Sequence, residues 1–359
     1  MRIDMHCHVI GNGKDISKVN EDVYFNAADN QHWFTWILYH MLHADITRMG
    51  GNPDEDDSVS TDEYFDLIYR LFSQSIEIDG LVLLALDAVY KDGVVDEKKT
   101  DLWVSNEFLR GRVVKLNEKL AAESDTAKSK KRFFMGASVN PNRPDACSAL
   151  EKVVDNPDAV LLKWIPSAQH IDVKLVSDDF YNILKNSKVP LLCHVGPEYS
   201  FPEGIRNMEK DDFNFLRKPL DLAVKVIAAH CASPVFPIKD PNRMAEFRSL
   251  MEEYNSGGDV RLWSDTSALS LATRLPVISD ILDMFPAKWL VHGTDFPIPI
   301  DGWPHLPFVT PDITPAEYKD IMKTKNPFDR DVKIKRAHGF DESIITNAAK
   351  VLRLPGNAP

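Results

Sequence analysis

The fold is decided by two neighbouring stretches, VPLLCHV at residues 189–195 and VIAAH at residues 226–230. Each is a short apolar run that carries a histidine at or next to its end. Continuous apolar runs of this length are typical of parallel strands, because both faces of such strands are covered. The two stretches lie about one βα unit of roughly 30 residues apart. They therefore predict consecutive parallel strands joined by a helix.

The same pattern extends outward from these stretches in both directions. Between the apolar runs lie segments whose apolar residues recur three or four positions apart, as on one face of a helix. Eight strands alternating with helices predict an α/β fold, a (β/α)8 TIM barrel, either regular or distorted. The eight expected strands are residues 2–6, 80–86, 133–139, 159–165, 189–195, 226–230, 260–263 and 288–291.

The first βα unit is much longer than the others. We interpret the chain as a single barrel domain over residues 1–359 that carries a helical insertion at about residues 11–78. One helix is expected from Gln31 to Arg48, and another after the capping box Ser60-Thr61-Asp62-Glu63. An acidic loop at residues 50–57 separates them. An insertion in a β-to-α loop overhangs the active face of a barrel, as a lid, a surface decoration or a dimer contact.

Composition and charge exclude several classes of protein. The 359 residues are 44% hydrophobic and 27% charged, as in an ordinary globular protein. A formal net charge of −12 argues against nucleic-acid binding. Four scattered cysteines fit a reducing compartment, and neither a signal peptide nor an apolar run of about 20 residues is visible. We expect a cytoplasmic protein that does not bind membranes.

Histidines and an aspartate stand where the expected strands end. His6 and His8 are two residues apart, and side chains two apart on a strand point the same way. His194, His230 and Asp295 each follow another apolar run. Four histidines and an aspartate at one rim of a barrel are a plausible set of metal ligands, although a lone histidine there is more often a core residue. Such ligands suit Zn, with Mn, Fe, Co or Ni as alternatives.

These residues carry a resemblance to a known family. The runs Asp4-Met5-His6-Cys7-His8 and His292-Gly293-Thr294-Asp295-Phe296-Pro297, with His194 and His230 between them, resemble the motifs of the amidohydrolase superfamily. The chain is most similar to the branch of metal-dependent hydrolases and decarboxylases that resemble aminocarboxymuconate semialdehyde decarboxylase. The resemblance covers nearly the whole chain and implies a metal-dependent enzyme.

The resemblance also implies roles for individual residues. His6, His8, His194 and Asp295 would bind a catalytic metal. Asp295 would in addition accept a proton from the activated water, and His230 would polarise the substrate or transfer a proton. Asp295 and His230 are therefore the candidate catalytic residues.

Lys163 leaves two metal arrangements open. In binuclear members of the superfamily a lysine at the end of the fourth strand is carboxylated and bridges two ions, with His194 and His230 on the second ion. In the decarboxylase-like branch such a lysine is often unmodified and faces the substrate as a cation. We favour one ion over two. A simple ion pair between Lys163 and a nearby carboxylate is the structural alternative.

Four further residues are candidates for substrate binding besides Lys163. Trp164 and Phe296 follow strand ends, where they could line an apolar pocket. Arg206 and Arg217 follow the fifth strand and could bind a carboxylate through two parallel hydrogen bonds. Loop packing is the alternative for the aromatic residues, and a solvated surface position is the alternative for the arginines.

Three functions follow from this pattern, in order of preference. The first is a hydrolase that activates a water for attack on a small amide, ester or lactone, the substrate being an organic acid or its derivative. The second is a lyase that decarboxylates a carboxylated aromatic compound or a semialdehyde. The third is a barrel that binds metal without turnover. Related enzymes are often dimers, so a homodimer is also expected.

Overall fold

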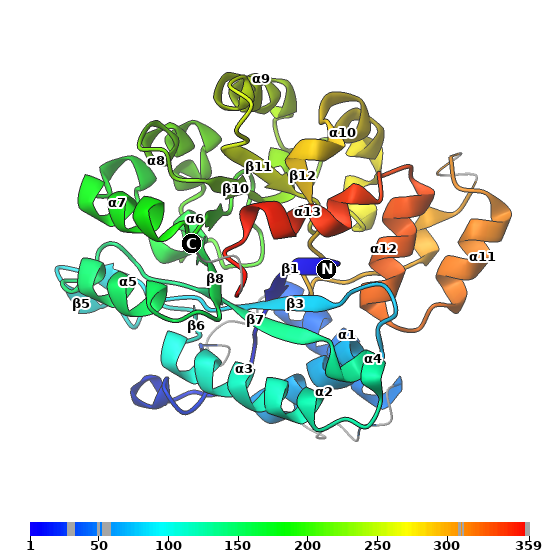
Figure 1. Ribbon diagram of the computed structural model, residues 1–359, viewed down its shortest axis with the longest axis horizontal. Helices are drawn as coiled ribbons and strands as arrows, with labels where there is room; N and C mark the ends of the chain where they lie inside the picture. The colour runs from blue at the N-terminus through cyan, green and yellow to red at the C-terminus, as the bar shows by residue number, and fades with distance from the viewer. Residues whose placement is uncertain (27–32, 49–50, 52–58, 308–309, 311, 356–359) are drawn as a thin grey trace.

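The computed structural model describes the chain except for residues 27–32, 49–50, 52–58, 308–309, 311 and 356–359. Its centre is an eight-stranded parallel sheet, and each strand overlaps one of the eight expected from the sequence (Figure 1). The order is β1-β3-β7-β8-β9-β10-β11-β12. The bounds are Ile3–His8, Gly80–Leu84, Arg132–Ala137, Ala159–Trp164, Leu191–Cys193, Val226–Ala228, Leu262–Asp265 and Leu290–Val291.

Three backbone hydrogen bonds close the ring between β1 and the segment that follows β12. They run from the Met5 N–H to His292 O (3.1 Å), from the Asp295 N–H to His6 O (2.8 Å) and from the His8 N–H to Phe296 O (2.7 Å). Sheet closure by a parallel first and last strand, with helices between successive strands, is the TIM-barrel arrangement. The predicted fold is confirmed.

Helices surround the ring, and Figure 1 shows α13 crossing its centre in that view. The helices are α1 (Trp33–Arg48), α2 (Thr61–Gln74), α3 (Asn106–Ala121), α4 (Thr126–Ser129), α5 (Ala146–Val154), α6 (Pro166–Gln169), α7 (Asp178–Ser187), α8 (Arg217–Asp221), α9 (Met244–Asn255), α10 (Ile278–Met284), α11 (Pro315–Lys323), α12 (Pro327–Ala337) and α13 (Ser343–Val351). None of the described helices has both the length and the apolar character to cross a bilayer.

The hydrophobic core has an inner and an outer part. The inner part fills the barrel with strand residues such as Leu161 and Ile227, and α13 adds Ala348 and Val351 to it. The larger outer part lies between the strands and the surrounding helices. Because the inner part includes α13, that helix covers one mouth of the barrel and leaves the functional site to the other.

A bulge in β1 changes the side-chain alternation next to the site. Regular alternation predicts that Met5 and Cys7 share the face opposite His6 and His8. The structure places Met5 in the inner core and Cys7 in the outer core. The cause is one extra residue between Asp4 and Cys7 in the pairing with β3. Bulges of this kind redirect side chains beside active sites.

The segment between β1 and β3 contains the two expected helices. The capping box at Ser60 and Glu63 is present at the start of α2, and α1 ends at Arg48 as predicted. Apart from Gly51, the acidic loop at residues 50–57 lies outside the described residues. A short antiparallel pair, β2 (Tyr24–Phe25) with β6 (Leu102–Trp103), joins this segment to the loop after β3. Another hairpin, β4 (Tyr90–Lys91) with β5 (Val94–Val95), follows β3.

Two buried histidines join the loop after β12 to the end of α12. His305 Nε2 lies 3.1 Å from the Ser270 carbonyl oxygen, which can only accept, so His305 Nε2 donates. Its Nδ1 therefore accepts from His338 Nε2 at 3.0 Å. Burial lowers the pKa of both histidines to about 4, and for His305 the neighbouring His338 adds to the effect. Both imidazoles are neutral at neutral pH.

This pair predicts a loss of stability in acid. Because an unfolded histidine titrates near pH 6.5, the unfolded chain binds more protons than the folded chain between about pH 6.5 and pH 4. The free energy of unfolding therefore falls as the pH falls through this range. The substitution His338→Asn keeps a donor toward His305 and removes one titrating group. Urea denaturation at about pH 7 and pH 5 should show the variant losing about 2 kcal/mol less than the wild type. Parallel pH profiles of the two proteins would contradict this account.

Candidate metal centre and active site

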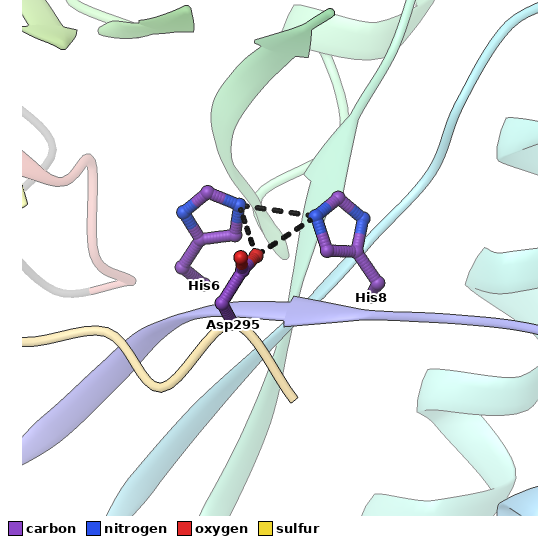
Figure 2. Close-up of side chains that lie close together, drawn as sticks. All are labelled: His6, His8 and Asp295. Carbon is purple, nitrogen blue, oxygen red and sulfur yellow. Dashed lines mark hydrogen bonds and ion pairs between the residues drawn. The ribbon is translucent and has the colours of Figure 1, made fainter. Parts of the chain in front are cut away.

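The centre of the site is formed by His6, His8 and Asp295. Both Nε2 atoms lie 3.2 Å from Asp295 Oδ1, and they are 3.1 Å from each other. Figure 2 shows the two imidazoles of β1 and the carboxylate from the segment after β12 turned toward one another. All three ligand atoms lie within 4.8 Å of one another. This spacing and this donor set fit one divalent transition ion.

Asp265, at the end of β11, fixes the tautomer of His6. Its Oδ2 lies 2.7 Å from His6 Nδ1, and both side chains are fully buried. A carboxylate beside Nδ1 keeps the proton there, so that the lone pair is on Nε2 and points at the centre. Burial alone would raise the pKa of Asp265, but the His6 imidazole and its hydrogen bond lower it below the usual range. Asp265 is therefore ionised and orients His6 for metal binding.

His230 is held in an uncommon backbone conformation at the end of β10. Its φ of 59° is left-handed, and its N–H donates to Asp265 Oδ1 at 2.9 Å. The Nδ1 atom lies 3.0 Å from the Ser267 carbonyl oxygen, so Nδ1 donates and Nε2 keeps its lone pair. Nε2 lies 3.9 Å from Asp295 Oδ2. Burial, and then the Arg274 guanidinium, lower the pKa of His230 well below its usual value, so that the imidazole is a neutral base.

His194 lies beside His230 but outside the group of three. The ring centroids of the two histidines are 5.1 Å apart, and His194 Nδ1 lies 3.5 Å from Glu198 Oε2. Burial lowers the pKa of His194 to about 4, which leaves the imidazole neutral. Its Nε2 is buried and has no hydrogen-bond partner within the described residues. Asp295 Oδ1 is also buried and has no hydrogen-bond partner among the described residues. A buried nitrogen and a buried carboxylate oxygen without other partners fit the role of metal ligands.

Lys163, at the end of β8, is fully buried and lies at the same centre. Its Nζ is 3.1 Å from His6 Nε2. Burial lowers its pKa, and the carboxylates of Asp295 and Asp265 counteract that effect. A buried ammonium of this kind needs nearby negative charge, which these two carboxylates supply. Both metal arrangements considered for Lys163 are compatible with this position.

A cavity with two lobes opens onto this centre. Both lobes include His194, Glu198, His230 and Asp295. The first lobe, of about 90 Å³, is otherwise mostly apolar, and Phe25 and Leu102 from the β2–β6 pair contribute to it. The second lobe, of about 220 Å³, extends toward Arg274. A larger hollow of about 600 Å³ lies between α3 and α5, but it contains none of the expected ligands.

The comparison with protein families decides the family. A family model described as "Amidohydrolase" matches residues 3–333. The chain belongs to the amidohydrolase family. The superfamily expected from the sequence is thereby confirmed, and the protein is an enzyme of that family. No curated protein matches the chain.

Solved structures of related fold are distant in sequence from this amidohydrolase. A probable 2-pyrone-4,6-dicarboxylic acid hydrolase from Acinetobacter baumannii and a 5-carboxyvanillate decarboxylase from Sphingomonas paucimobilis each have 12% identity and a TM-score of 0.48, with coverage of 98% of this chain and 99% of theirs. A 4-oxalomesaconate hydratase from Rhodopseudomonas palustris has 14% identity and a TM-score of 0.42, with the same coverage. The family assignment rests on the sequence match.

Four residues expected at the substrate pocket of the amidohydrolase lie elsewhere. Trp164 points outward, because it follows the inward-facing Lys163 on β8; its ring packs on α7 and its Nε1 donates to Val139 O at 2.8 Å. Phe296 packs outside the barrel between Tyr64 of α2 and Phe328 of α12.

The two arginines expected to bind a carboxylate are also in other positions. Arg206 donates to Phe201 O at 2.6 Å and stacks on Tyr199, where it stabilises the loop after β9. Arg217 is 44% exposed on α8 and pairs with Glu253. Neither lines the cavity, because Arg206 is bonded to the Phe201 carbonyl and Arg217 extends from α8 toward Glu253 at the surface. The expectation for these residues was wrong.

Sequence reasoning did not identify several residues of the amidohydrolase site. Asp265 was given no role, although its position just after the expected strand at residues 260–263 was a usable signal. Glu198 follows His194 by four residues and was visible only as a charged loop residue. Arg274 and Ser267 lie in loops without a regular period. Their direction is set by tertiary contacts, and no local pattern reveals it.

The contact between Asp265 and His6 can be tested through metal affinity. The substitution Asp265→Asn removes the charge that keeps the proton on Nδ1, so metal affinity should fall by about 10- to 100-fold. The dissociation constant would be measured by competition with a chromogenic chelator. The control is Asp329→Asn, which changes another buried carboxylate, one that accepts from the Ser75 hydroxyl and the Ile76 N–H before β3. Equal affinities for Asp265→Asn and the wild type would exclude an orienting role.

Proposed function

We propose that the protein is a metal-dependent hydrolase of a small amide, ester or lactone. The convergence of His6 Nε2, His8 Nε2 and Asp295 Oδ1 on one point supports this function most directly. His194 would complete the ligand set through its unpartnered Nε2. When bound, a divalent transition ion, Zn above all, lowers the pKa of a water and polarises a carbonyl oxygen.

Asp295 and His230 would carry out the proton transfers. Asp295 Oδ2 and His230 Nε2 are 3.9 Å apart and both line the cavity. Asp295 Oδ2 can accept a proton from the attacking water, and His230, which is neutral with its proton on Nδ1, can take up that proton on Nε2. It can then return the proton to the leaving group. General acid–base catalysis of this kind contributes about 10²- to 10⁴-fold in rate.

One ion is our proposal for the metal content. The three convergent ligand atoms surround a single position, and His194 is the fourth ligand. In the alternative with two ions, carboxylated Lys163 would bridge them and His230 would become a ligand. An unmodified Lys163 would instead present its ammonium to the substrate.

Decarboxylation is the second candidate function. It uses the same ligands and needs a cationic group to hold a carboxylated substrate. The buried Arg274 in the second lobe of the cavity is a specific observation in its favour.

A homodimer, a single domain, a lid role for the helical segment and a cytoplasmic location stay predictions. The four cysteines are free thiols, as a reducing compartment requires.

Metal content is the first test of the proposed function. Elemental analysis of protein purified without chelators should give one transition ion per chain. The double substitution His6→Ala/His8→Ala should reduce this to near zero, because it removes two of the convergent ligands. The variant His338→Asn, which changes a buried histidine elsewhere, should keep the full content. Two ions per chain would support a carboxylated Lys163, and none after reconstitution would contradict the proposal.

The role of Asp295 can be tested separately by turnover. The substitution Asp295→Asn should lower kcat by at least about 100-fold, because it removes both a ligand and a proton acceptor. The assay would follow acid release from a panel of lactones and aryl esters, with carbon dioxide release from carboxylated aromatics measured in parallel. Asp283→Asn, on the exposed side of α10, is the matched control. Full turnover by Asp295→Asn would remove Asp295 from the mechanism.

A further inference from the structure

Arg274 is a buried arginine that lines the second lobe of the cavity. It lies in the short helical turn Ala272–Val277 after β11 and is 3% exposed. Its Nε has no hydrogen-bond partner, and its guanidinium makes no hydrogen bond or ion pair with the described residues. Other inward arginines of the chain are satisfied: Arg330 and Arg353 each donate to three backbone carbonyls. A buried charge without a partner is costly, so the exception at Arg274 calls for a ligand.

Arg274 lines the same lobe of the cavity as residues of the candidate metal centre. A molecule bound in that lobe could therefore contact both. The second lobe of the cavity includes Arg274 together with His194, His230 and Asp295. Thr273 also contributes to this lobe, and its Oγ1 is a second buried donor without a hydrogen-bond partner. The rest of the lobe includes apolar side chains, among them Val235, Phe236 and Leu271. Two unpartnered donors therefore face a partly apolar space beside the centre.

Glu198 is one alternative partner of Arg274, but its two oxygens already have other contacts. Oε1 accepts from the Ser200 N–H at 2.6 Å, and Oε2 lies 3.5 Å from His194 Nδ1. Asp265 is bonded to His6 and His230, and Asp295 faces the two histidines of β1. Each carboxylate near Arg274 thus has another partner. The guanidinium remains available for a group that enters from the cavity.

The chemistry of Arg274 favours an anionic ligand. Its buried guanidinium carries a positive charge and lines the second lobe together with the unpartnered Thr273 hydroxyl. An arginine fork matches a carboxylate through two parallel hydrogen bonds. A single carboxylate would satisfy the donors of Arg274.

We propose that Arg274, with Thr273 beside it, binds a carboxylate of the substrate and so selects small organic acids with an apolar body. This inference rests on the proposed function, because it assigns the reacting carbon to the end of the cavity where His6, His8 and Asp295 converge. Arg274 takes the role that the sequence had suggested for Arg206 and Arg217. A substrate carboxylate bound by Arg274 is compatible with both candidate reactions. In hydrolysis the reacting group is a separate amide, ester or lactone, and in decarboxylation it is a second carboxylate.

Benzoate is a suitable probe, with benzamide as its neutral counterpart of the same shape. Calorimetric titrations would be made on the metal-loaded protein and on the metal-free protein, since benzoate could also bind to the ion itself. We expect benzoate to bind the metal-free wild type at least 10-fold more tightly than benzamide. The substitution Arg274→Gln should weaken benzoate binding at least 10-fold and leave metal content unchanged. Arg217→Gln, on the outer surface, is the control and should bind benzoate as the wild type does.

The outcomes separate this inference from the proposed function. Unchanged benzoate binding by Arg274→Gln, or equal binding of benzoate and benzamide by the wild type, would overturn the role of Arg274 even if metal binds as proposed. Absence of metal binding would contradict the hydrolase while the metal-free titration still tests Arg274. If Arg274→Gln does not fold, Arg274→Lys keeps the charge but loses the fork, and should weaken benzoate binding at least 3-fold. Comparing the two probes on the wild type needs no variant.

Discussion

The pairing of β1 with the segment after β12 is the constraint on which the site depends. Three backbone hydrogen bonds at this seam bring residues 5–8 against residues 292–296, from opposite ends of the chain. Asp4 strengthens it, because its carboxylate accepts from both the N–H and the hydroxyl of Thr294. Gly293 permits the approach: a Cβ there would lie 2.7 Å from the His6 Cβ. The proposed metal ligands His6, His8 and Asp295 converge because the barrel closes at this seam.

Behind the ligands, a small group of buried polar residues determines which atoms are free to act. Asp265 keeps one proton on His6 Nδ1 and accepts from the His230 backbone, and Ser267 accepts from His230 Nδ1. The lone pairs of both imidazoles are thereby directed into the cavity. Such orientation lowers the cost of assembling the site when a ligand arrives. Among the described residues, Asp265 in particular is fixed on several sides, because it contacts His6, the His230 backbone and the Ser267 hydroxyl.

The cavity above this centre is completed by loops that are far apart in the sequence. The β2–β6 pair brings Phe25 and Leu102 to the first lobe, and the segments after β9 and β11 supply Glu198 and Arg274. The barrel thus provides the metal ligands, and the loops provide the shape and charge that select a substrate. The elements that shape this cavity include the short strands β2 and β6 and the 3-10 turn Ala272–Val277. None of them has a strong signal in the amino-acid sequence.

The barrel, its eight strands and the grouping of His6, His8 and Asp295 could be predicted from the amino-acid sequence, because apolar periodicity and residues at strand ends are local properties. The tertiary structure alone decided the rest. A bulge moved Met5 inward, strand alternation turned Trp164 outward, and His292 proved to be buried near Asp331 of α12, away from the cavity. It also left Arg217 on the surface and buried Arg274 beside the centre. The direction of a loop side chain depends on contacts between distant segments, which no local pattern records.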